Sequence, residues 1–184
     1  MTNMNKFVIL SLGVVVAILA IALFTFFSRK AAAPENKHMT ITSPGLRQNA
    51  LIPKQFTCDG ENINPELAIG AIPENAKGLA LIMDDPDAPR GTFTHWLLWN
   101  ISPNTFSIAE NSVPAGALQG KNGAGKNSYI GPCPPLGKPH RYFFKLYALD
   151  ALLNLSAGAD KNSLESEINA HLLAKAEIIL IYQR

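Results

Sequence analysis

The alternation of apolar and polar residues predicts strands in the second half of the chain. Residues 78–83 are a short apolar run bounded by turn signals, which is typical of a buried central strand. Residues 95–101 and 141–149 are also predicted as strands, and residues 177–182 close the chain as a last apolar strand. In the strand over 95–101, alternation places Trp96, Leu98 and Asn100 on one face and His95, Leu97, Trp99 and Ile101 on the other.

Two segments are rich in turn-forming residues. Residues 40–67 are broken by Pro and Gly into short pieces, which fits short strands joined by turns. Residues 102–139 are rich in Gly, Pro, Asn and Ser and carry no helical period. A loop of that length inside a domain is usually functional.

One segment has the period of an amphipathic helix. Asn162 and Glu165 are spaced as a capping box, and apolar residues then recur at every fourth position up to Leu172. The pattern predicts a helix that ends near Lys175. Many short strands with one late helix indicate an all-β sandwich with a small C-terminal helical element.

The amino terminus carries an apolar run whose length suits a membrane-spanning helix. Phe7 to Phe27 is almost uninterrupted, with Lys6 before it and Arg29 and Lys30 after it. A signal-peptide core is usually ~7–15 residues long, whereas a spanning helix needs about 20. Length favours a retained anchor, and the small residues at 31–33 keep a cleaved signal open as the alternative.

The expected organisation is an anchor or signal segment over 1–33, a linker over 34–40 and one domain over 41–184. We expect the domain to be exported, anchored to the membrane if the segment is retained and secreted if it is cleaved. Three of the 16 basic residues and none of the 14 acidic residues lie in 1–33, so the domain has a net charge near −1. Such a domain, without a basic cluster, gives no electrostatic footprint for nucleic acid.

The chain has two cysteines, Cys58 and Cys133. An even number in an exported domain is compatible with one disulfide, whereas the same pair in the cytosol would more often be two buried thiols. The residue pattern by itself leaves both interpretations open.

Five side chains with acid–base chemistry stand at the ends of predicted strands, next to proline-rich turns: Asp85, Asp87, His95, His140 and Tyr142. Because a proline follows Asp85, the chain there should be extended, and Asp85 and Asp87 should share a face unless a proline kinks the segment. Two like charges that close are costly unless a neighbour neutralises them. If the strand ends converge, a carboxylate can fix the tautomer of an imidazole, raise its pKa and let it donate to an anion.

Each of these residues also has a structural interpretation. Asp before Pro commonly starts a turn, a single His at a strand start is commonly a structural hydrogen-bonding residue, and Tyr142 can belong to the core. The chain contains no GxSxG nucleophile elbow and no HExxH motif. Two Asp and two His could in principle bind a divalent metal ion.

Three separated motifs resemble the phosphatidylethanolamine-binding protein family, in its bacterial and archaeal branch also called Raf kinase inhibitor-like. The motifs are DPDAP at 85–89, HWLLWN at 95–100, and GPCPP at 131–135 followed by HRYFFKLYALD at 140–150. The resemblance runs from about residue 41 to residue 184 and includes FTCDGENINPEL near its start. It implies a sandwich of two antiparallel sheets of Greek-key type with a small anion pocket.

The resemblance also implies which residues form the pocket: Asp85, Asp87, His95, Pro134, Pro135, His140 and Tyr142. It implies that Cys58 and Cys133 lie near the pocket mouth, which favours a disulfide, and that the Ala88–Pro89 bond is cis. In the family this pocket binds phosphate-like or acetate-like anions and phospholipid headgroups. We expect no cofactor and no metal ion.

The sequence therefore predicts a non-enzymatic domain that binds a small phosphate or carboxylate anion, or a phospholipid headgroup, with an affinity that falls as pH rises past neutrality. The membrane is the expected partner of the N-terminal segment. The alternative is an inhibitor of a protease or another protein that acts through the loop at 102–139. Mutation of His95 and His140 separates the two functions, because only the first should lose its ligand.

Overall fold

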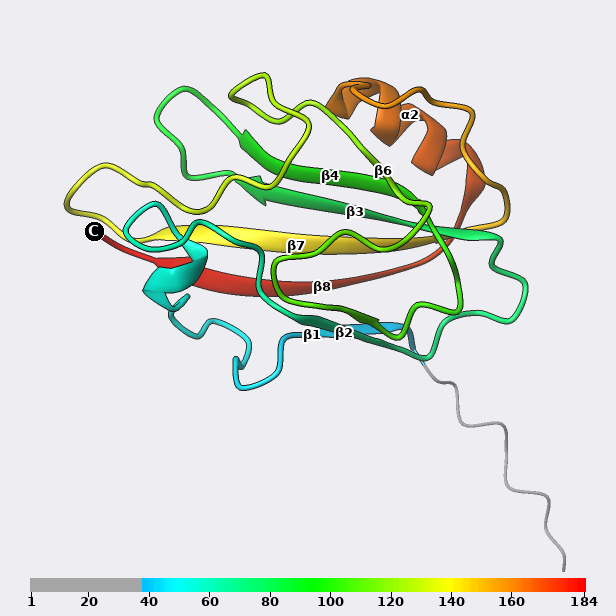
Figure 1. The fold of residues 1–184 in the computed structure, drawn as a ribbon, viewed down its shortest axis with the longest axis horizontal. Helices are drawn as coiled ribbons and strands as arrows, with labels where there is room; N and C mark the ends of the chain where they lie inside the picture. The colour runs from blue at the N-terminus through cyan, green and yellow to red at the C-terminus, as the bar shows by residue number, and fades with distance from the viewer. Residues whose placement is uncertain (1–37) are drawn as a thin grey trace, which may run out of the picture. The chain divides into compact units, whose positions relative to one another are not determined.

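The computed structural model describes residues 38–184, which form two antiparallel sheets, one α-helix and one short 3-10 helix (Figure 1). The predicted anchor over 1–33 and most of the linker over 34–40 lie outside the described residues, so these boundaries stay predictions. Met39 packs in the core and β1 begins at Thr40. Within residues 38–184, no helix combines the length and apolar character that a membrane span requires.

The small sheet has the strand order β1-β2-β5, and the large sheet has the order β6-β4-β3-β7-β8. The small sheet consists of β1 (Thr40–Thr42), β2 (Leu67–Gly70) and β5 (Ser107–Ile108). The large sheet consists of β6 (Leu118–Gln119), β4 (Phe93–Ile101), β3 (Gly78–Asp85), β7 (His140–Leu149) and β8 (Leu172–Tyr182). The spatial order β7-β3-β4-β6 is that of a Greek key, because β7 returns to lie beside β3 after β4 and β6.

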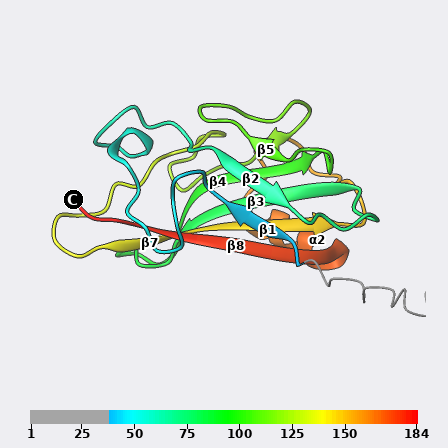
Figure 2. The same cartoon turned by 90° about the horizontal axis from the view of Figure 1, so that it is seen from below.

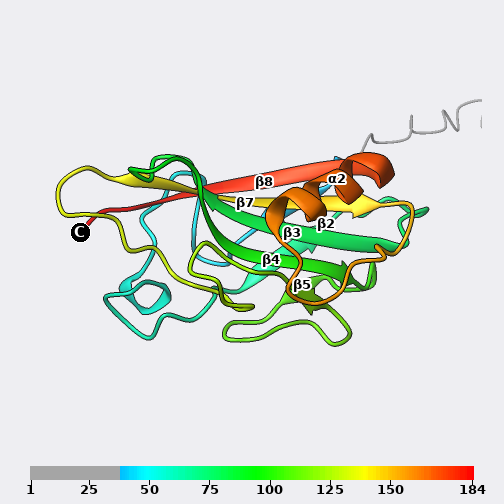
Figure 3. The same cartoon turned by 90° about the horizontal axis from the view of Figure 1, so that it is seen from above.

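The large sheet is covered on both faces. One face packs against the small sheet around Leu81, Trp96 and Phe144, as the view from below shows (Figure 2). The other face packs against α2 (Lys161–His171) around Ile82 and Leu164, as the view from above shows (Figure 3). Every residue of β3 is buried for this reason, which confirms the prediction of a buried central strand.

Strand β4 departs from simple alternation at two places. The register between β3 and β4 shifts by one residue near Asn100, which has a positive φ of 55°, and again next to His95. The first shift returns Ile101 to the face of Trp96 and Leu98, so its predicted place beside Leu97 is wrong. A bulge inserts one extra residue and redirects the side chains that follow, which alternation alone does not reveal.

The helix and the last strand have other boundaries than the sequence predicts. The N-cap of α2 is Asp160, whose carboxylate accepts a hydrogen bond from the backbone N–H of Ser163 at 2.8 Å, in place of the predicted cap at Asn162. The helix ends at His171, and β8 begins at Leu172 instead of near residue 177. Pairing of residues 172–176 with the end of β7 stabilises the extended chain there and outweighs the helical period.

The long segment over 102–139 is an ordered part of both sheets. It contributes β5 to the small sheet and β6 to the large sheet. The 3-10 helix η1 (Lys54–Phe56) contacts the same segment, since the Tyr129 hydroxyl donates a hydrogen bond to the carbonyl oxygen of Phe56 at 2.8 Å. Residues 38–184 contain no cis peptide bond, so the expected cis bond at Ala88–Pro89 is trans in this structure.

Candidate functional site

A cavity of about 670 Å³ opens where the end of β3, the start of β4 and the start of β7 meet. The loops over 86–92 and 133–139 border it at the end of the sandwich that holds the C-terminus (Figure 1). Five of the predicted pocket residues line this cavity: Asp85, His95, Pro134, Pro135 and His140. The strand ends therefore converge as the sequence predicts.

His140 and Asp85 form a buried pair at the cavity floor. The Nδ1 atom of His140, the first residue of β7, lies 2.7 Å from Oδ2 of Asp85, the last residue of β3. A carboxylate accepts hydrogen bonds, so Nδ1 carries the proton and donates it. The ring is thereby fixed in orientation, and its Nε2 atom is the nitrogen left for the cavity.

His95 is held by a peptide group instead of a carboxylate. Its Nδ1 atom donates to the carbonyl oxygen of Ile130 at 2.7 Å, and its ring packs edge-to-face on Tyr142 with centroids 5.2 Å apart. It also contacts Phe93 edge-to-face at 4.9 Å, because the bulge in β4 turns it away from Leu97 toward the cavity. Again Nε2 is the nitrogen that remains for a ligand.

Burial lowers the pKa of His95 below its ordinary value of 6.5. The hydrogen bond to Ile130 and the negative charge of Asp85 oppose this effect but do not reverse it. A nearby carboxylate was expected to raise the pKa of the cavity histidines, and for His95 that expectation is wrong, since desolvation outweighs the charge of Asp85.

Asp87 does not line the cavity, and its carboxylate pairs with Arg141 instead. Its carboxylate accepts hydrogen bonds from Nε and Nη2 of Arg141, at 2.8 and 2.7 Å, and from the backbone N–H of the same residue at 2.9 Å. The hydrogen bond from the Arg141 side chain lowers the pKa of Asp87 to about 2. Its own N–H donates to Oδ1 of Asp85 at 2.8 Å and fixes the turn, and the two carboxylates have separate side-chain partners, Arg141 and His140.

Tyr142 belongs to the core beneath the cavity. It is fully buried, and within residues 38–184 its hydroxyl is the one buried side-chain polar atom without a hydrogen-bond partner. Burial, reinforced by the negative charge of Asp85, raises the pKa of this phenol. An unpaired buried hydroxyl costs free energy that a ligand oxygen within its reach would offset.

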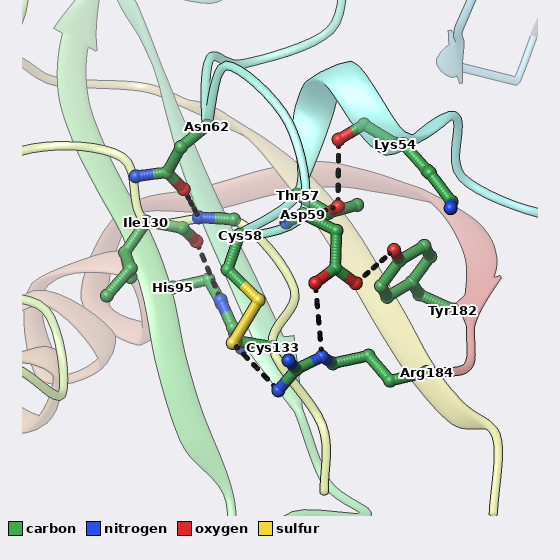
Figure 4. The surroundings of a disulfide bond; sticks show 11 residues. Lys54, Thr57, Cys58, Asp59, Asn62, His95, Ile130, Cys133, Tyr182 and Arg184 are labelled. Atoms are coloured by element: carbon green, nitrogen blue, oxygen red, sulfur yellow. Dashed lines mark hydrogen bonds and ion pairs between the residues drawn. A yellow bond between two sulfur atoms is a disulfide. The ribbon is translucent and has the colours of Figure 1, made fainter. Parts of the chain in front are cut away.

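Cys58 and Cys133 form a disulfide, as the family resemblance favours (Figure 4). Cys133 lines the cavity, and the bond ties its segment to the residues that follow η1. Two backbone hydrogen bonds support the same junction, from Cys58 N–H to the Pro132 carbonyl at 3.1 Å and from Gly131 N–H to Asn62 Oδ1 at 2.7 Å. One wall of the cavity is therefore joined to the loop after η1 by covalent and hydrogen bonds.

Sequence reasoning missed several residues that line the cavity. Arg90 and Lys121 supply positive charge, and Phe93 and Ile130 supply apolar wall. Arg90 directly follows the DPDAP motif, so its position in the sequence was a usable signal. Lys121 and Ile130 lie in the long segment over 102–139, where no pattern distinguishes them. Within the described part of the chain, no group of three or more His, Cys, Asp or Glu is placed to hold a metal ion.

The fold and the cavity together define a β-sandwich protein with a histidine-floored pocket. Comparison with known families gives a match of residues 42–183 to the phosphatidylethanolamine-binding protein model. The chain therefore belongs to the phosphatidylethanolamine-binding protein family, as the sequence motifs indicate.

Known relatives include proteins of archaea and bacteria. A UPF0098 protein of Methanothermobacter thermautotrophicus is 44% identical over 151 residues, which cover 79% of this chain and 99% of the relative. The structure of a Chlamydia trachomatis protein, described as a phosphatidylethanolamine-binding protein homologue, matches with a TM-score of 0.76 and 38% identity, covering 80% of this chain and 98% of that one. Escherichia coli YbcL, described as a new member of the mammalian family, matches with a TM-score of 0.76 and 29% identity over 80% and 99% of the two chains.

Proposed function

We propose that this domain binds a small phosphate or carboxylate anion, free or as a phospholipid headgroup, in the cavity of Asp85, His95 and His140. One observation carries the proposal: the Nδ1 atoms of both buried histidines are committed to fixed protein acceptors. Each ring therefore presents Nε2 to the cavity in a defined direction, and an Nε2 atom that takes up a proton becomes an N–H donor for an anion oxygen.

The positive charge near the histidines supports an anion as the ligand. Arg90 and Lys121 line the same cavity, whereas the acidic group in the lining, Asp85, is already paired with His140. The family name adds a coarser expectation, because a phosphatidylethanolamine-binding protein binds a phosphorylated headgroup. The positive charge in the lining therefore favours an anionic ligand in this cavity.

We propose that binding is not followed by a reaction. A hydrolase needs an activated nucleophile within reach of a base. The thiol that lines the cavity, Cys133, is held in a disulfide and cannot serve as that nucleophile. A phosphomonoester incubated with the domain should therefore be recovered unchanged, and release of inorganic phosphate above the buffer rate would contradict the proposal.

We also propose that the domain works outside the cytosol, beside the membrane that residues 1–33 would enter. The disulfide supports this location, because such bonds persist in oxidising compartments and are rare in the cytosol. Protease protection of the full chain in intact cells tests it. When protease is added on the outer side of the membrane that holds the chain, we expect it to digest the domain. Full protection of the domain from that protease would contradict the proposed location.

A thermal-shift titration tests the binding proposal. The fragment from Pro34 is suitable, since the archaeal relative consists almost entirely of the matching domain. With phosphate, phosphoethanolamine or acetate at 100-fold above Kd, the free energy of unfolding rises by about 2.7 kcal/mol, which is roughly 5–10 °C in Tm. His95→Gln should abolish the shift, whereas the matched control His171→Gln, outside the cavity, should retain it. No shift with any anion would refute the proposal.

The second candidate function is inhibition of a protease or another protein through the segment over 102–139. It is favoured by three large apolar side chains that this segment exposes, Phe106 at 68%, Val113 at 40% and Leu136 at 81%. Exposed apolar residues on an otherwise ordered segment suit a protein contact. Phe106→Ser should then abolish inhibition of the partner, whereas His95→Gln should not. Inhibition that depends on His95 alone would exclude this candidate.

A further inference from the structure

The cavity changes character between its floor and its mouth. His95 and His140 at the floor are 4% and 7% exposed, whereas Arg90 and Lys121 in the same lining are exposed residues. The two cations therefore stand on the solvent side of the histidines. Between them lie apolar groups, among which Phe93 contacts His95.

Arg90 and Lys121 are free to bind a ligand. Within residues 38–184 neither of them forms an ion pair with a carboxylate. Asp160 is the acidic residue that could pair with Lys121, because the backbone N–H of Lys121 donates to the carbonyl of Ala159, the residue before Asp160, at 3.0 Å. The Asp160 carboxylate, however, caps α2 by accepting from Ser163 N–H. Two positive charges without an ion-pair partner among the described residues thus line the same cavity.

Arg90 stands on a well-braced loop. The turn before it is held by the Asp87 carboxylate, which binds the guanidinium of Arg141 in two hydrogen bonds. The chain after it turns back at Gly91, whose N–H donates to the Ala88 carbonyl at 3.1 Å. The backbone that carries this cation is therefore positioned before a ligand arrives, which lowers the entropic cost of binding.

Lys121 stands on a second braced loop, at the other side of the cavity. The next residue, Asn122, is buried, and its Oδ1 accepts from the N–H groups of Ala124 and Lys126 at 2.9 and 3.0 Å. Its Nδ2 donates to the Ser128 carbonyl at 2.8 Å. Three hydrogen bonds of one side chain define this loop, so the backbone that carries the second cation is also held in place.

We propose that the cavity selects ligands with two separated anionic groups, one at the His95–His140 floor and the second at Arg90 and Lys121 in the mouth. This inference rests on the proposed function, because it assigns the ligand class of the same site. A volume of about 670 Å³ leaves room for a spacer and a second group beyond a single phosphate. A cationic tail such as that of phosphoethanolamine is disfavoured at the mouth, since like charges repel.

A series of phosphomonoesters with one head and different tails tests the inference by titration calorimetry. Glycerol 3-phosphate has a neutral tail, phosphoethanolamine a cationic tail and 3-phosphoglycerate an anionic tail, and inorganic phosphate has no tail. We expect 3-phosphoglycerate to bind most tightly and phosphoethanolamine least tightly. Raising the salt concentration should reduce the difference in affinity between 3-phosphoglycerate and phosphoethanolamine, because the charges in the mouth are exposed to solvent. A short-chain phosphatidylserine added as a further arm shows whether a lipid can supply the same two charges.

The double variant Arg90→Gln/Lys121→Gln should remove the preference. Its affinity for 3-phosphoglycerate should fall by roughly fivefold for each cation lost, while its affinity for inorganic phosphate stays within about twofold. Lys138→Gln is the matched control, because Lys138 is an exposed cation of the neighbouring loop that does not line the cavity. The control should leave the order of affinities unchanged.

The outcomes separate the inference from the proposed function. If inorganic phosphate and glycerol 3-phosphate bind in a His95-dependent manner but 3-phosphoglycerate has no advantage, the two-charge inference is wrong and the anion site stands. An advantage that survives in the double variant also overturns the inference. If none of the four compounds binds, the proposed function fails together with it.

Discussion

The two cavity histidines differ in the group that accepts their Nδ1 proton. For His140 the acceptor is the Asp85 carboxylate, and for His95 it is the Ile130 peptide carbonyl. A carboxylate supplies negative charge that stabilises an imidazolium, whereas a carbonyl supplies only a dipole. Burial therefore dominates at His95 and lowers its pKa, so this ring is neutral near pH 7 in the ligand-free domain.

Anion binding should therefore be coupled to proton uptake at His95. An anion oxygen needs an N–H donor, and Nε2 of the neutral ring has none. A bound anion stabilises the imidazolium, so the pKa of His95 is higher in the complex than in the free domain. Between those two pKa values affinity falls as pH rises, by up to about tenfold per pH unit for one proton.

Calorimetry in buffers of different ionisation enthalpy measures this proton uptake directly. Near neutral pH the wild type should take up a larger number of protons on binding phosphate than His95→Gln, which cannot titrate. His171→Gln should behave as the wild type, because His171 pairs with Asp150 away from the cavity. Equal affinity at pH 5.5 and pH 8 would contradict the coupling.

The Asp87–Arg141 pair should contribute stability that is lost in acid. The hydrogen bonds from Arg141 lower the pKa of Asp87 from 3.8 to about 2, so the folded domain binds fewer protons there than the unfolded chain. This contribution is present above about pH 4 and disappears as pH falls toward 2. Asp87→Asn should lower Tm at pH 7, and the difference from wild type should shrink toward pH 2. A difference that is independent of pH would show that charge is not its cause.

At the scale of single residues, the sequence motifs supplied five residues of the cavity lining but not the orientation of the side chains. Asp85, His95 and His140 could be predicted because each stands next to a recognisable motif. The bulge that turns His95 toward the cavity could not, since it depends on the register between β3 and β4. Asp87 and Tyr142 took the structural roles that local chemistry allowed, a turn residue and a core residue.

Among the elements, β3 shows how one strand end serves two functions. Asp85 faces the cavity, whereas the preceding Asp84 faces the opposite side of the sheet and binds Lys145 and Lys161 at 3.1 and 2.8 Å. Lys161 is the first residue of α2, so Asp84 anchors the helix to the sheet. Neighbouring residues of a strand point to opposite faces, which is why two adjacent carboxylates have separate roles.

Asp84→Ala should therefore destabilise the domain without affecting anion binding. Asp84 is 1% exposed, and its loss leaves Lys145 without its partner and Lys161 with only the longer ion pair to Glu165 at 3.5 Å. Removing one member of a buried ion pair costs about 3–5 kcal/mol, and here roughly 2–4 kcal/mol is expected because the lysines are partly exposed. Urea unfolding gives the stability, and phosphate titration gives the affinity. A large loss of affinity would mean that Asp84 also shapes the cavity.

The disulfide should stabilise the fold more than the site. It joins residues that are 75 positions apart, and loss of a bond that closes such a loop costs about 2–4 kcal/mol. The double variant Cys58→Ser/Cys133→Ser should lose this stability in urea unfolding. The hydrogen bonds of Cys58 and Gly131 hold the same wall, so phosphate affinity should change little. Complete loss of binding would assign the bond a role in the cavity itself.

The sequence predicted an element correctly where the spacing of its apolar residues matched the faces that the fold buries. The runs that became β3 and β7 were found almost to their ends, because both are central strands with strong patterns. The boundary between α2 and β8 was not, because the helical period continues through Leu172 while the chain pairs with Leu149 of β7. Long-range pairing decided that boundary, and it cannot be read from a local window.

For the whole molecule, the fold class followed from many short strands and one helix, and the family resemblance supplied the arrangement of the two sheets. The closeness of the β3, β4 and β7 ends depends on the Greek-key return of β7 beside β3. Residues far apart in sequence, such as Asp85 and His140, meet for that reason. Loop residues such as Lys121 join the same cavity only through the tertiary structure, so no sequence pattern marks them.

The most direct test of anion binding is nitrogen-15 NMR of the histidine rings during a phosphate titration. The chain has four histidines, so two cavity residues can be compared with two internal controls in one sample. We predict that the Nε2 signal of His95 moves toward the protonated form and that of His140 also shifts as phosphate binds, while those of His38 and His171 stay unchanged. If the cavity signals do not respond, or if all four respond equally, phosphate is not bound at the His95–His140 floor.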